Sequence, residues 1–268
     1  MSKTVAFAGL GQRRRAAQAR TLGRICVGIC TCAAVVAAGW LGVREYSDPR
    51  FFADAVSVAG NERLAKTDII AAAAIARDRN VWFVDVRKAA RRIERLPWIE
   101  SAAISRRWPN HVRITVSERM PAFRLRLPRA AGAAQTPQRY ALLDKTLRVL
   151  SVGSLAPADL SLPLLSLTPT PKVLTRPGAW ATSTDVAPLY GAMLRLRSLG
   201  VNAAVFDLTP ETGISALVDG RWRVLFGKLD DLEEKVALLR AIVPKIDRPK
   251  DVVNIDLRAV RAPAVLYR

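Results

Sequence analysis

The chain has 268 residues, of which 50% are hydrophobic, and its formal net charge is +19. This hydrophobic share excludes a generally disordered protein, and the length is sufficient for one large or two small domains with their own cores. The three cysteines, Cys26, Cys30 and Cys32, all lie in one apolar stretch near the N-terminus. The rest of the chain therefore has no disulfide and no thiol nucleophile, which excludes a disulfide scaffold and a thiol enzyme.

This apolar stretch, residues 25–43, contains no charged side chain and is bounded by Arg24 and Arg44. As a helix it would be about 28 Å long, close to the thickness of the hydrocarbon core of a bilayer. Residues 1–24 contain basic but no acidic side chains, and a short basic flank stays in the cytoplasm. We therefore predict a cytoplasmic basic tail, one transmembrane helix, and an exported remainder from residue 44 onward.

A cleaved signal peptide is the alternative reading of this segment. Residues 36–38 could serve as a small-residue cleavage site, but the apolar run is longer than the 7–15 residues usual in signal peptides. The sequence pI of about 11.0 suits nucleic-acid binding. We expect no nucleic-acid partner, because the exported part would meet none, and the charge suits a membrane surface or an anionic wall polymer.

The first part of the exported region alternates between strand and helix signals. The expected elements are a strand within 51–60, a helix over 68–77, a helix from 86 to Pro97, and strands over 98–107 and 112–116. Thr67 and Asp85 are the expected N-caps of the two helices. The order strand, helix, helix, strand, strand predicts an antiparallel sheet covered by two helices.

Residues 123–138 are basic, small and proline-containing, which predicts a loop or hinge. The elements expected after it are a hairpin over 139–150, a helix over 185–198, a hairpin over 214–226, a helix from Asp230 or Asp231 to Pro244, and strands over 252–258 and 264–268. A two-residue turn at Asp219-Gly220 would pair Leu217 with Trp222. Strands therefore dominate this second region, with two flanking helices.

We find no pattern that predicts catalysis, a cofactor or a metal site. His111 is the only histidine, it lies in a predicted turn, and no motif gives it a nucleophile or an orienting acid. Paired acidic residues near 230–234 suit a helix start, and Glu118-Arg119 and Asp256-Arg258 are expected to form strand ion pairs. We expect no enzyme activity and no small-molecule substrate.

The last strand, 264–268, is a possible sheet edge, and an edge strand can recruit a partner through its unpaired backbone groups. Tyr267 would suit an interface. The alternative, that this strand only closes the domain, is equally compatible with the sequence.

Four short phrases in order resemble the membrane-proximal POTRA domain of the FtsQ/DivIB cell-division proteins. They are Gly60-Asn61, Leu96-Pro97-Trp98-Ile99, Arg107-Trp108-Pro109-Asn110 and Val116-Ser117-Glu118-Arg119-Met120-Pro121, and they follow a single N-terminal span. Residues 227–239 and 255–258 also resemble this family. Two departures concern turns, since Lys145-Thr146-Leu147 and Ser166 stand where the family usually has glycine.

The resemblance implies an α+β architecture with a β-rich C-terminal domain. The implied segments are a cytoplasmic tail (1–24), a transmembrane helix (25–43), a linker (44–50), a POTRA domain (51–122), a loop or hinge (123–138) and a β-rich domain ending in a partner-binding strand (139–268). It also implies a non-enzymatic divisome scaffold in the cell inner membrane at the septum, which helps to control septal peptidoglycan synthesis. The alternatives are a POTRA-bearing protein of export or outer-membrane assembly, and an exported wall enzyme.

The resemblance further implies FtsB and FtsL, acting as a complex, and other divisome proteins as partners. Arg258 matches the arginine of the family's Asp-aliphatic-Arg-Tyr phrase, but Ala259 replaces the tyrosine. The implied partner-binding residues are Arg258, Ala259, Ala264, Val265, Leu266 and Tyr267. A weaker second surface is the exposed helix face over 87–92.

Overall fold

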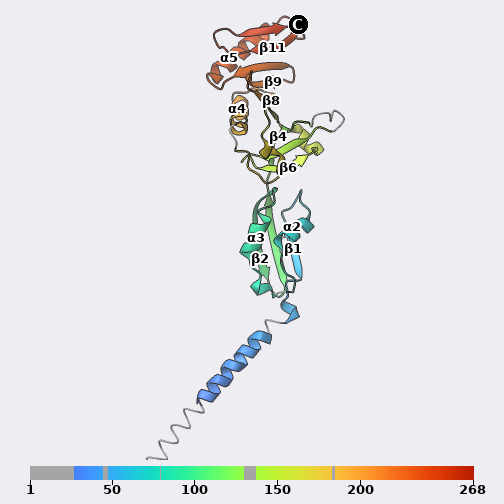
Figure 1. The fold of residues 1–268 in the computed structure, drawn as a ribbon, viewed down its shortest axis with the longest axis vertical. Helices are drawn as coiled ribbons and strands as arrows, with labels where there is room; N and C mark the ends of the chain where they lie inside the picture. The colour runs from blue at the N-terminus through green and yellow to red at the C-terminus, as the bar shows by residue number, and fades with distance from the viewer. Residues whose placement is uncertain (1–26, 45–47, 79, 130–136, 183–184) are drawn as a thin grey trace, which may run out of the picture. The chain divides into compact units, whose positions relative to one another are not determined.

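The computed structural model describes residues 27–44, 48–78, 80–129, 137–182 and 185–268 (Figure 1). The predicted tail, 1–24, and Cys26 lie outside these ranges. The described chain forms two compact units. The first unit comprises the chain up to Ser57 with Ile75–Val86 and Ser105–Arg113, and the second comprises Val58–Ala74, Arg87–Ile104 and Ile114–Arg268.

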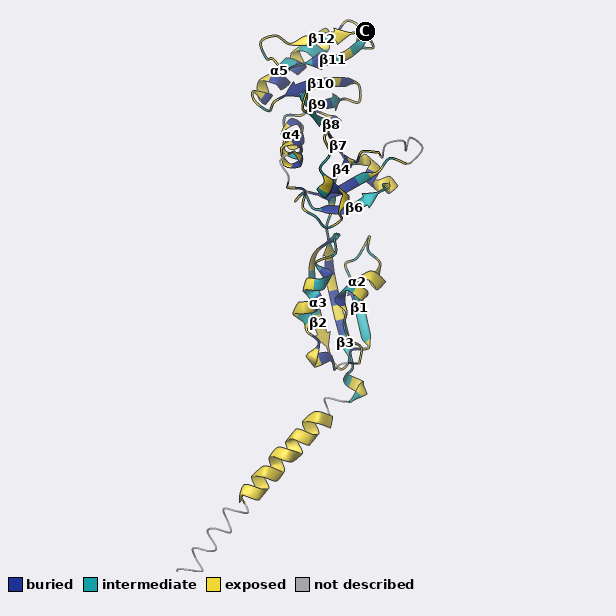
Figure 2. Cartoon of the chain, in the orientation of Figure 1, coloured by how far each residue is buried: buried dark blue, intermediate teal, exposed yellow. Residues whose placement is uncertain are grey.

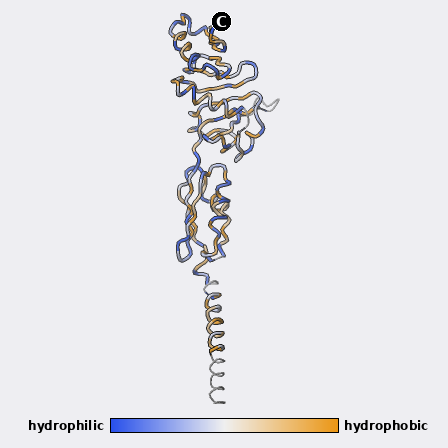
Figure 3. Tube along the Cα trace, turned by 90° about the vertical axis from the view of Figure 1, so that its left-hand side faces the viewer, coloured by the Kyte–Doolittle hydropathy of each residue, from blue (hydrophilic) through white to orange (hydrophobic). Residues whose placement is uncertain are grey.

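A single helix over Val27–Arg44 is long and apolar enough to cross a membrane. The predicted span, residues 25–43, begins two residues before the first described residue of this helix and ends one residue before its last. Its side chains are exposed along its whole length (Figure 2), and its trace is mostly hydrophobic (Figure 3). A fully exposed apolar helix is stable only when another apolar phase covers it, which supports the prediction of a membrane span.

The next part of the chain has the predicted order strand, helix, helix, strand, strand. Its elements are η1 (Pro49–Phe51), β1 (Ala55–Ala59), α2 (Lys66–Ala73), η2 (Val81–Phe83), α3 (Val86–Ile93), β2 (Ile99–Arg107) and β3 (His111–Glu118). The strands form one sheet in the order β1-β3-β2. The α+β architecture predicted from the sequence is confirmed.

The predicted bounds of α2 are wrong at both ends. The helix begins after Ala65, whose extended backbone accepts hydrogen bonds from the backbone N–H groups of Asp68 and Ile69, so Thr67 lies inside the first turn. It ends at Ala73 rather than Arg77, because Ala74 adopts a left-handed conformation with φ of 47°. A left-handed residue at this position is a common way for a helix to end.

The remaining strands form a nine-stranded sheet in the order β12-β11-β10-β9-β8-β7-β4-β5-β6. Its strands are β4 (Pro121–Arg126), β5 (Tyr140–Asp144), β6 (Val149–Gly153), β7 (Leu164–Leu167), β8 (Ala203–Thr209), β9 (Gly213–Val218), β10 (Trp222–Gly227), β11 (Val252–Asp256) and β12 (Ala264–Tyr267). The helices are η3 (Pro157–Ser161), η4 (Lys172–Thr175), α4 (Val186–Ser198), α5 (Leu232–Ile242) and η5 (Val243–Lys245).

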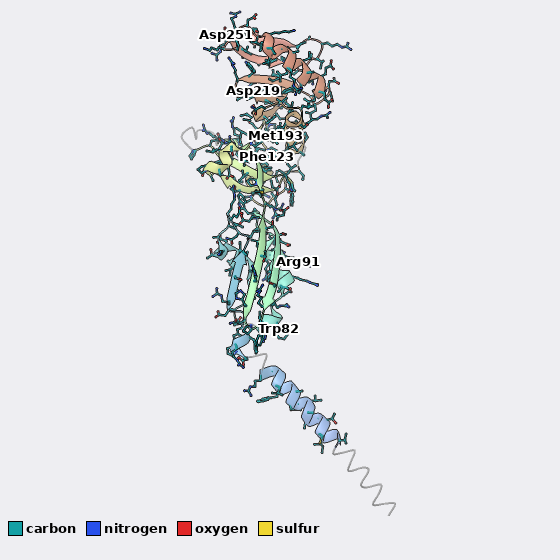
Figure 4. The ribbon with its side chains drawn as sticks, turned by 180° about the vertical axis from the view of Figure 1, so that it is seen from behind. Trp82, Arg91, Phe123, Met193, Asp219 and Asp251 are labelled. Atoms are coloured by element: carbon teal, nitrogen blue, oxygen red, sulfur yellow. The ribbon has the colours of Figure 1, made fainter. Side chains whose placement is uncertain are left out.

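Three strands of this sheet, β4, β7 and β8, lie outside the elements expected from the sequence. Phe123 to Arg126, expected in a loop, belong to β4, which pairs with both β5 and β7. Phe123, labelled in Figure 4, and Leu125 are fully buried, and they alternate with the half-buried Arg124 and the exposed Arg126, which is the period-two pattern of a strand. Strand β8 was not predicted at all, although it lies in the middle of the sheet.

The hairpin of β9 and β10 has a different register from the predicted one. Trp222 pairs with Val218 and Val224 with Ala216, so three residues, not two, separate the first pair. Asp219 and Gly220 both adopt positive φ, as the turn chemistry predicts. The shift places Ala216 in the core and leaves Leu217 half-buried, the reverse of the predicted arrangement.

Candidate partner-binding edge

Strand β12 lies at one edge of the nine-stranded sheet and pairs only with β11 (Figure 2). The antiparallel register places Tyr267 opposite Val252, Leu266 opposite Asn254, and Ala264 opposite Asp256. On the outer side of β12, no strand of the described chain pairs with its backbone. An antiparallel edge of this kind presents alternate N–H and C=O groups to any incoming extended segment.

The two faces of β12 have different surroundings. Val265 is half-buried and packs against the hydrophobic core of the sheet, together with Val252 on the neighbouring strand. Leu266 points the other way and is 55% exposed, and Val253 of β11 is a second exposed apolar side chain. Val265 therefore supports the fold, and Leu266 is the apolar side chain of β12 that a partner can reach.

Tyr267 lies at the far end of the edge from Ala264. Its ring is 38% exposed, and the guanidinium of Arg248 lies 5.8 Å from the ring centroid. An aromatic ring that is partly covered by an arginine offers a rigid, amphipathic contact at low entropic cost. The role of Tyr267 as an interface side chain stays a prediction, and this exposure is compatible with it.

Arg258 follows β11 and forms the predicted ion pair with Asp256, with Nη2 and Oδ2 2.6 Å apart. The hydrogen bond from Arg258 lowers the pKa of the Asp256 carboxyl. The stem of Arg258 lies against Gly227, where an added Cβ would stand 3.0 Å from Cγ of Arg258. Gly213 in turn lies so close to Gly227 that its own Cβ would stand 2.8 Å from the Gly227 carbonyl.

A hollow of about 650 Å³ opens beside Arg258, and Ala259, the second predicted residue after β11, lines it. Other lining residues are Glu211, Lys228 and Arg261. A tyrosine at position 259 would occupy more of this space than the alanine does. The six predicted residues therefore form two groups. Ala264, Val265, Leu266 and Tyr267 make up β12, and Arg258 and Ala259 line the hollow.

Lys235 also lines the hollow and was not singled out from the sequence. It is buried, and its Nζ donates to the carbonyls of Phe226 and Lys228 at 3.0 and 2.8 Å. The sequence could have indicated this lysine by its position, because it lies on the apolar face of α5 beside Leu232 and Leu239. A lysine buried there needs hydrogen-bond acceptors inside the protein.

The other polar residues discussed above have structural contacts. His111 Nε2 lies 2.8 Å from Ser57 Oγ. Glu118 and Arg119 do not pair, because the Glu118 carboxylate accepts from the backbone N–H groups of residues 62–64 while Arg119 pairs with Asp144. Within the described ranges, no group of three or more His, Cys, Asp or Glu side chains is placed to hold a metal ion.

Comparison with known proteins bears on the part of the chain that follows the apolar helix. The family model described as the POTRA domain, FtsQ-type, matches residues 53–119. This chain contains an FtsQ-type POTRA domain. The matched range begins at the buried Ala53 and ends at Arg119, and it includes the three strands β1, β2 and β3 with helices α2 and α3.

Several curated proteins with the name cell division protein FtsQ are similar to the chain. The protein of Myxococcus fulvus (strain ATCC BAA-855 / HW-1) is 33% identical over 85 residues, which are 31% of this chain and 30% of that protein. That of Mycolicibacterium smegmatis (strain ATCC 700084 / mc(2)155) is 26% identical over 222 residues, or 82% of this chain and 60% of that protein. The predicted resemblance to the FtsQ/DivIB family is confirmed.

The extent of these alignments differs between relatives. The chain spans about a third of the length of the first relatives it matches, with 30%, 33% and 30% of each covered. The relative from Mycobacterium bovis (strain ATCC BAA-935 / AF2122/97) is 26% identical over 229 residues, or 85% of this chain and 66% of that protein. The longer alignments extend the FtsQ likeness beyond the POTRA domain into the nine-stranded sheet.

Proposed function

We propose that the protein is a non-enzymatic cell-division scaffold, held in the inner membrane by the helix Val27–Arg44 with its sheet-forming part outside the cytoplasm. The likeness to proteins named cell division protein FtsQ supports the division role. The apolar helix supports the single-pass attachment. As a scaffold at the septum, it links division proteins and so helps to control septal peptidoglycan synthesis.

The observation that carries the proposal is the open edge of β12. A partner strand can extend the sheet there by main-chain hydrogen bonds, while side-chain contacts select which segment binds. Leu266 offers the apolar contact on one face. The neighbouring hollow is lined by both acidic and basic side chains, and it therefore offers polar contacts beside the edge. We propose the FtsB–FtsL complex as the partner that occupies this edge.

Attachment to a common membrane strengthens such an interaction without any added contact. Two membrane-bound partners meet in a thin layer, so their effective concentration is far higher than it would be in bulk solution. A four-residue edge strand is a small contact, and it needs this increase, or a second contact beside the hollow, to be occupied for long.

The division role is tested by a fluorescent fusion at the cytoplasmic N-terminus, observed in dividing cells after depletion of the native copy. We expect a band at mid-cell and filamentous cells on depletion. An even membrane signal with normal division would refute the role and favour a POTRA-bearing protein of export or assembly. Purified protein that cleaved wall polymer would refute the non-enzymatic part of the proposal.

A further inference from the structure

The first unit contains a second exposed apolar surface, close to the membrane span along the chain. Residues 45–48 alone separate Arg44 from η1. A chain covers at most about 3.6 Å per residue, so η1 begins within about 18 Å of the end of the helix. If that helix crosses a membrane, this short connection keeps η1 and its neighbours beside the membrane surface in every orientation of the unit.

Three segments distant in sequence meet at η1. The ring of Phe51 contacts the ring of Trp108 at a centroid distance of 5.7 Å. Phe52 forms an isolated β-bridge with Asn80, and the Asn80 side chain accepts a hydrogen bond from the backbone N–H of Trp82 at 3.0 Å. These contacts hold the η2 segment and the turn at Trp108 beside the part of the chain that leaves the span.

Three aromatic side chains of these segments are exposed to solvent, whereas Phe51 is half-buried. Trp82 and Phe83 are each 57% exposed, and Trp108 is 68% exposed. Trp82 is labelled in Figure 4. We refer to Phe51, Trp82, Phe83 and Trp108 as the aromatic cluster. Large apolar side chains that gather on a surface in this way mark a site of interaction with another protein or with a membrane.

Basic side chains accompany the aromatic cluster. Arg106 and Arg107 directly precede Trp108 and are exposed, and Arg106 Nη2 donates to the carbonyl of Val84 at 2.7 Å. The guanidinium of Arg50 lies 6.0 Å from the centroid of the Phe51 ring, and its charge is balanced by an ion pair with Asp48 at 2.7 Å. Exposed tryptophan beside arginine is the composition that favours the head-group region of a bilayer, where rings reach the acyl boundary and cations meet phosphates.

We propose that the aromatic cluster docks on the head-group layer of the membrane that the N-terminal helix crosses, and that anionic phospholipid is its ligand. The proposal rests on the membrane attachment proposed above. The short connection after Arg44 places the cluster at a high effective concentration near lipid, so weak individual contacts are sufficient. Docking would restrict how far the segments that carry the aromatic cluster can move away from the membrane.

Quenching of tryptophan fluorescence by brominated lipid tests this docking. The full chain carrying Trp40→Phe, which removes the tryptophan of the span, is reconstituted into phosphatidylcholine–phosphatidylglycerol vesicles with bromine near the head groups. We expect clear quenching, and we expect most of it to disappear when Trp82→Phe and Trp108→Phe are added. The matched control adds Trp180→Phe instead, a partly exposed tryptophan of the second unit, and retains the quenching.

Two results would overturn the proposal. Quenching that is unchanged by Trp82→Phe and Trp108→Phe would show that lipid does not contact the aromatic cluster and would favour a protein partner there. Equal quenching in vesicles of phosphatidylcholine alone would exclude anionic lipid as the ligand. Flotation of the same vesicles reports attachment separately, because a chain that fails to float contradicts the membrane span and not the docking.

Discussion

Arg119 and Asp144 form the most deeply buried ion pair in the described part of the chain. Nη1 of Arg119 lies 2.8 Å from Oδ2 of Asp144, and the two side chains are 11% and 4% exposed. Arg119 ends the segment matched by the POTRA model, and Asp144 ends β5 of the nine-stranded sheet. Within the second unit, the pair therefore connects the end of the POTRA-matched segment to the nine-stranded sheet.

The Asp144 carboxylate also organises the turn that follows β5. It accepts hydrogen bonds from the N–H and hydroxyl of Thr146 and from the N–H of Arg148. Leu147 adopts a φ of 65°, the conformation for which glycine is usual. These hydrogen bonds stabilise a turn that lacks the glycine, which explains how the sequence Lys145-Thr146-Leu147 is accommodated.

Replacing Asp144 by alanine should destabilise the protein strongly. The change leaves the buried Arg119 without its counter-ion, and removing one partner of a buried pair costs about 3–5 kcal/mol. Urea unfolding of the detergent-solubilised chain measures the loss. The control is Glu233→Ala, which removes the exposed pair with Arg195 and should have a much smaller effect. Equal losses in the two variants would contradict the structural role of Asp144.

Acidification should remove the contribution of Asp144. Burial raises the pKa of its carboxyl, but hydrogen bonds from Thr146, Arg148 and Arg119 outweigh burial and place the pKa below its usual value of 3.8. The unfolded chain therefore binds this proton at a higher pH than the folded chain does. The stabilisation is present above about pH 4 and is lost as the pH falls through the lowered folded-state pKa.

Unfolding of wild type and Asp144→Asn between pH 7 and pH 3 measures this dependence. The stability difference between the two proteins should be largest near neutral pH and should shrink at the acid end. Parallel profiles over the whole range would show that the carboxylate does not contribute as a charge.

Leu266→Asp should prevent capture of the proposed FtsB–FtsL partner and leave the melting temperature unchanged. An exposed aspartate on β12 costs the fold little but places a charge in the contact that the partner must bury. Co-purification of the detergent-solubilised complex measures capture. Leu194→Asp, at an exposed leucine on α4, is the matched control and should bind normally.

Val265→Asp should behave differently from Leu266→Asp, because Val265 packs against the core of the sheet. We expect both capture and the melting temperature to fall. Normal capture by Leu266→Asp would exclude β12 as the docking edge.

Ala74→Gly should stabilise the protein by about 1 kcal/mol. Ala74 is exposed and left-handed, and its Cβ makes that conformation unfavourable by roughly 1–2 kcal/mol. Ala71→Gly, at an exposed position within α2, should destabilise by about 1 kcal/mol because glycine is a poor helix former. Thermal unfolding of the two variants compares them, and shifts of the same sign would contradict the left-handed conformation of Ala74.

Elements with local signals were predictable from the sequence. The alternation of β3 and the apolar face of α3 follow from residues within each element, and the predicted edge position of the last strand agrees with the sheet order. The β4 segment carried the same alternation through Phe123 and Leu125, but its arginines and flanking prolines made it resemble a loop. Its assignment depends on pairing with β5 and with β7, both of which come later in the chain.

Features that depend on distant residues were not predictable. Glu118 is the last residue of β3 and Arg119 follows the strand, and their side chains pair with different parts of the chain. The register between β9 and β10 depends on which face of each strand meets the core. A shift by one residue moves every side chain of a strand to the opposite face. Local turn chemistry alone does not determine that choice.

The close packing of Gly213, Gly227 and Arg258 has a consequence for genetics. Any side chain at Gly213 would displace the backbone of Gly227, and any side chain at Gly227 would displace Arg258. A search for alleles that lose partner capture should therefore return substitutions at these two glycines. Such alleles would map far from β12 in sequence, although they would act on the proposed binding edge through the residues beside it.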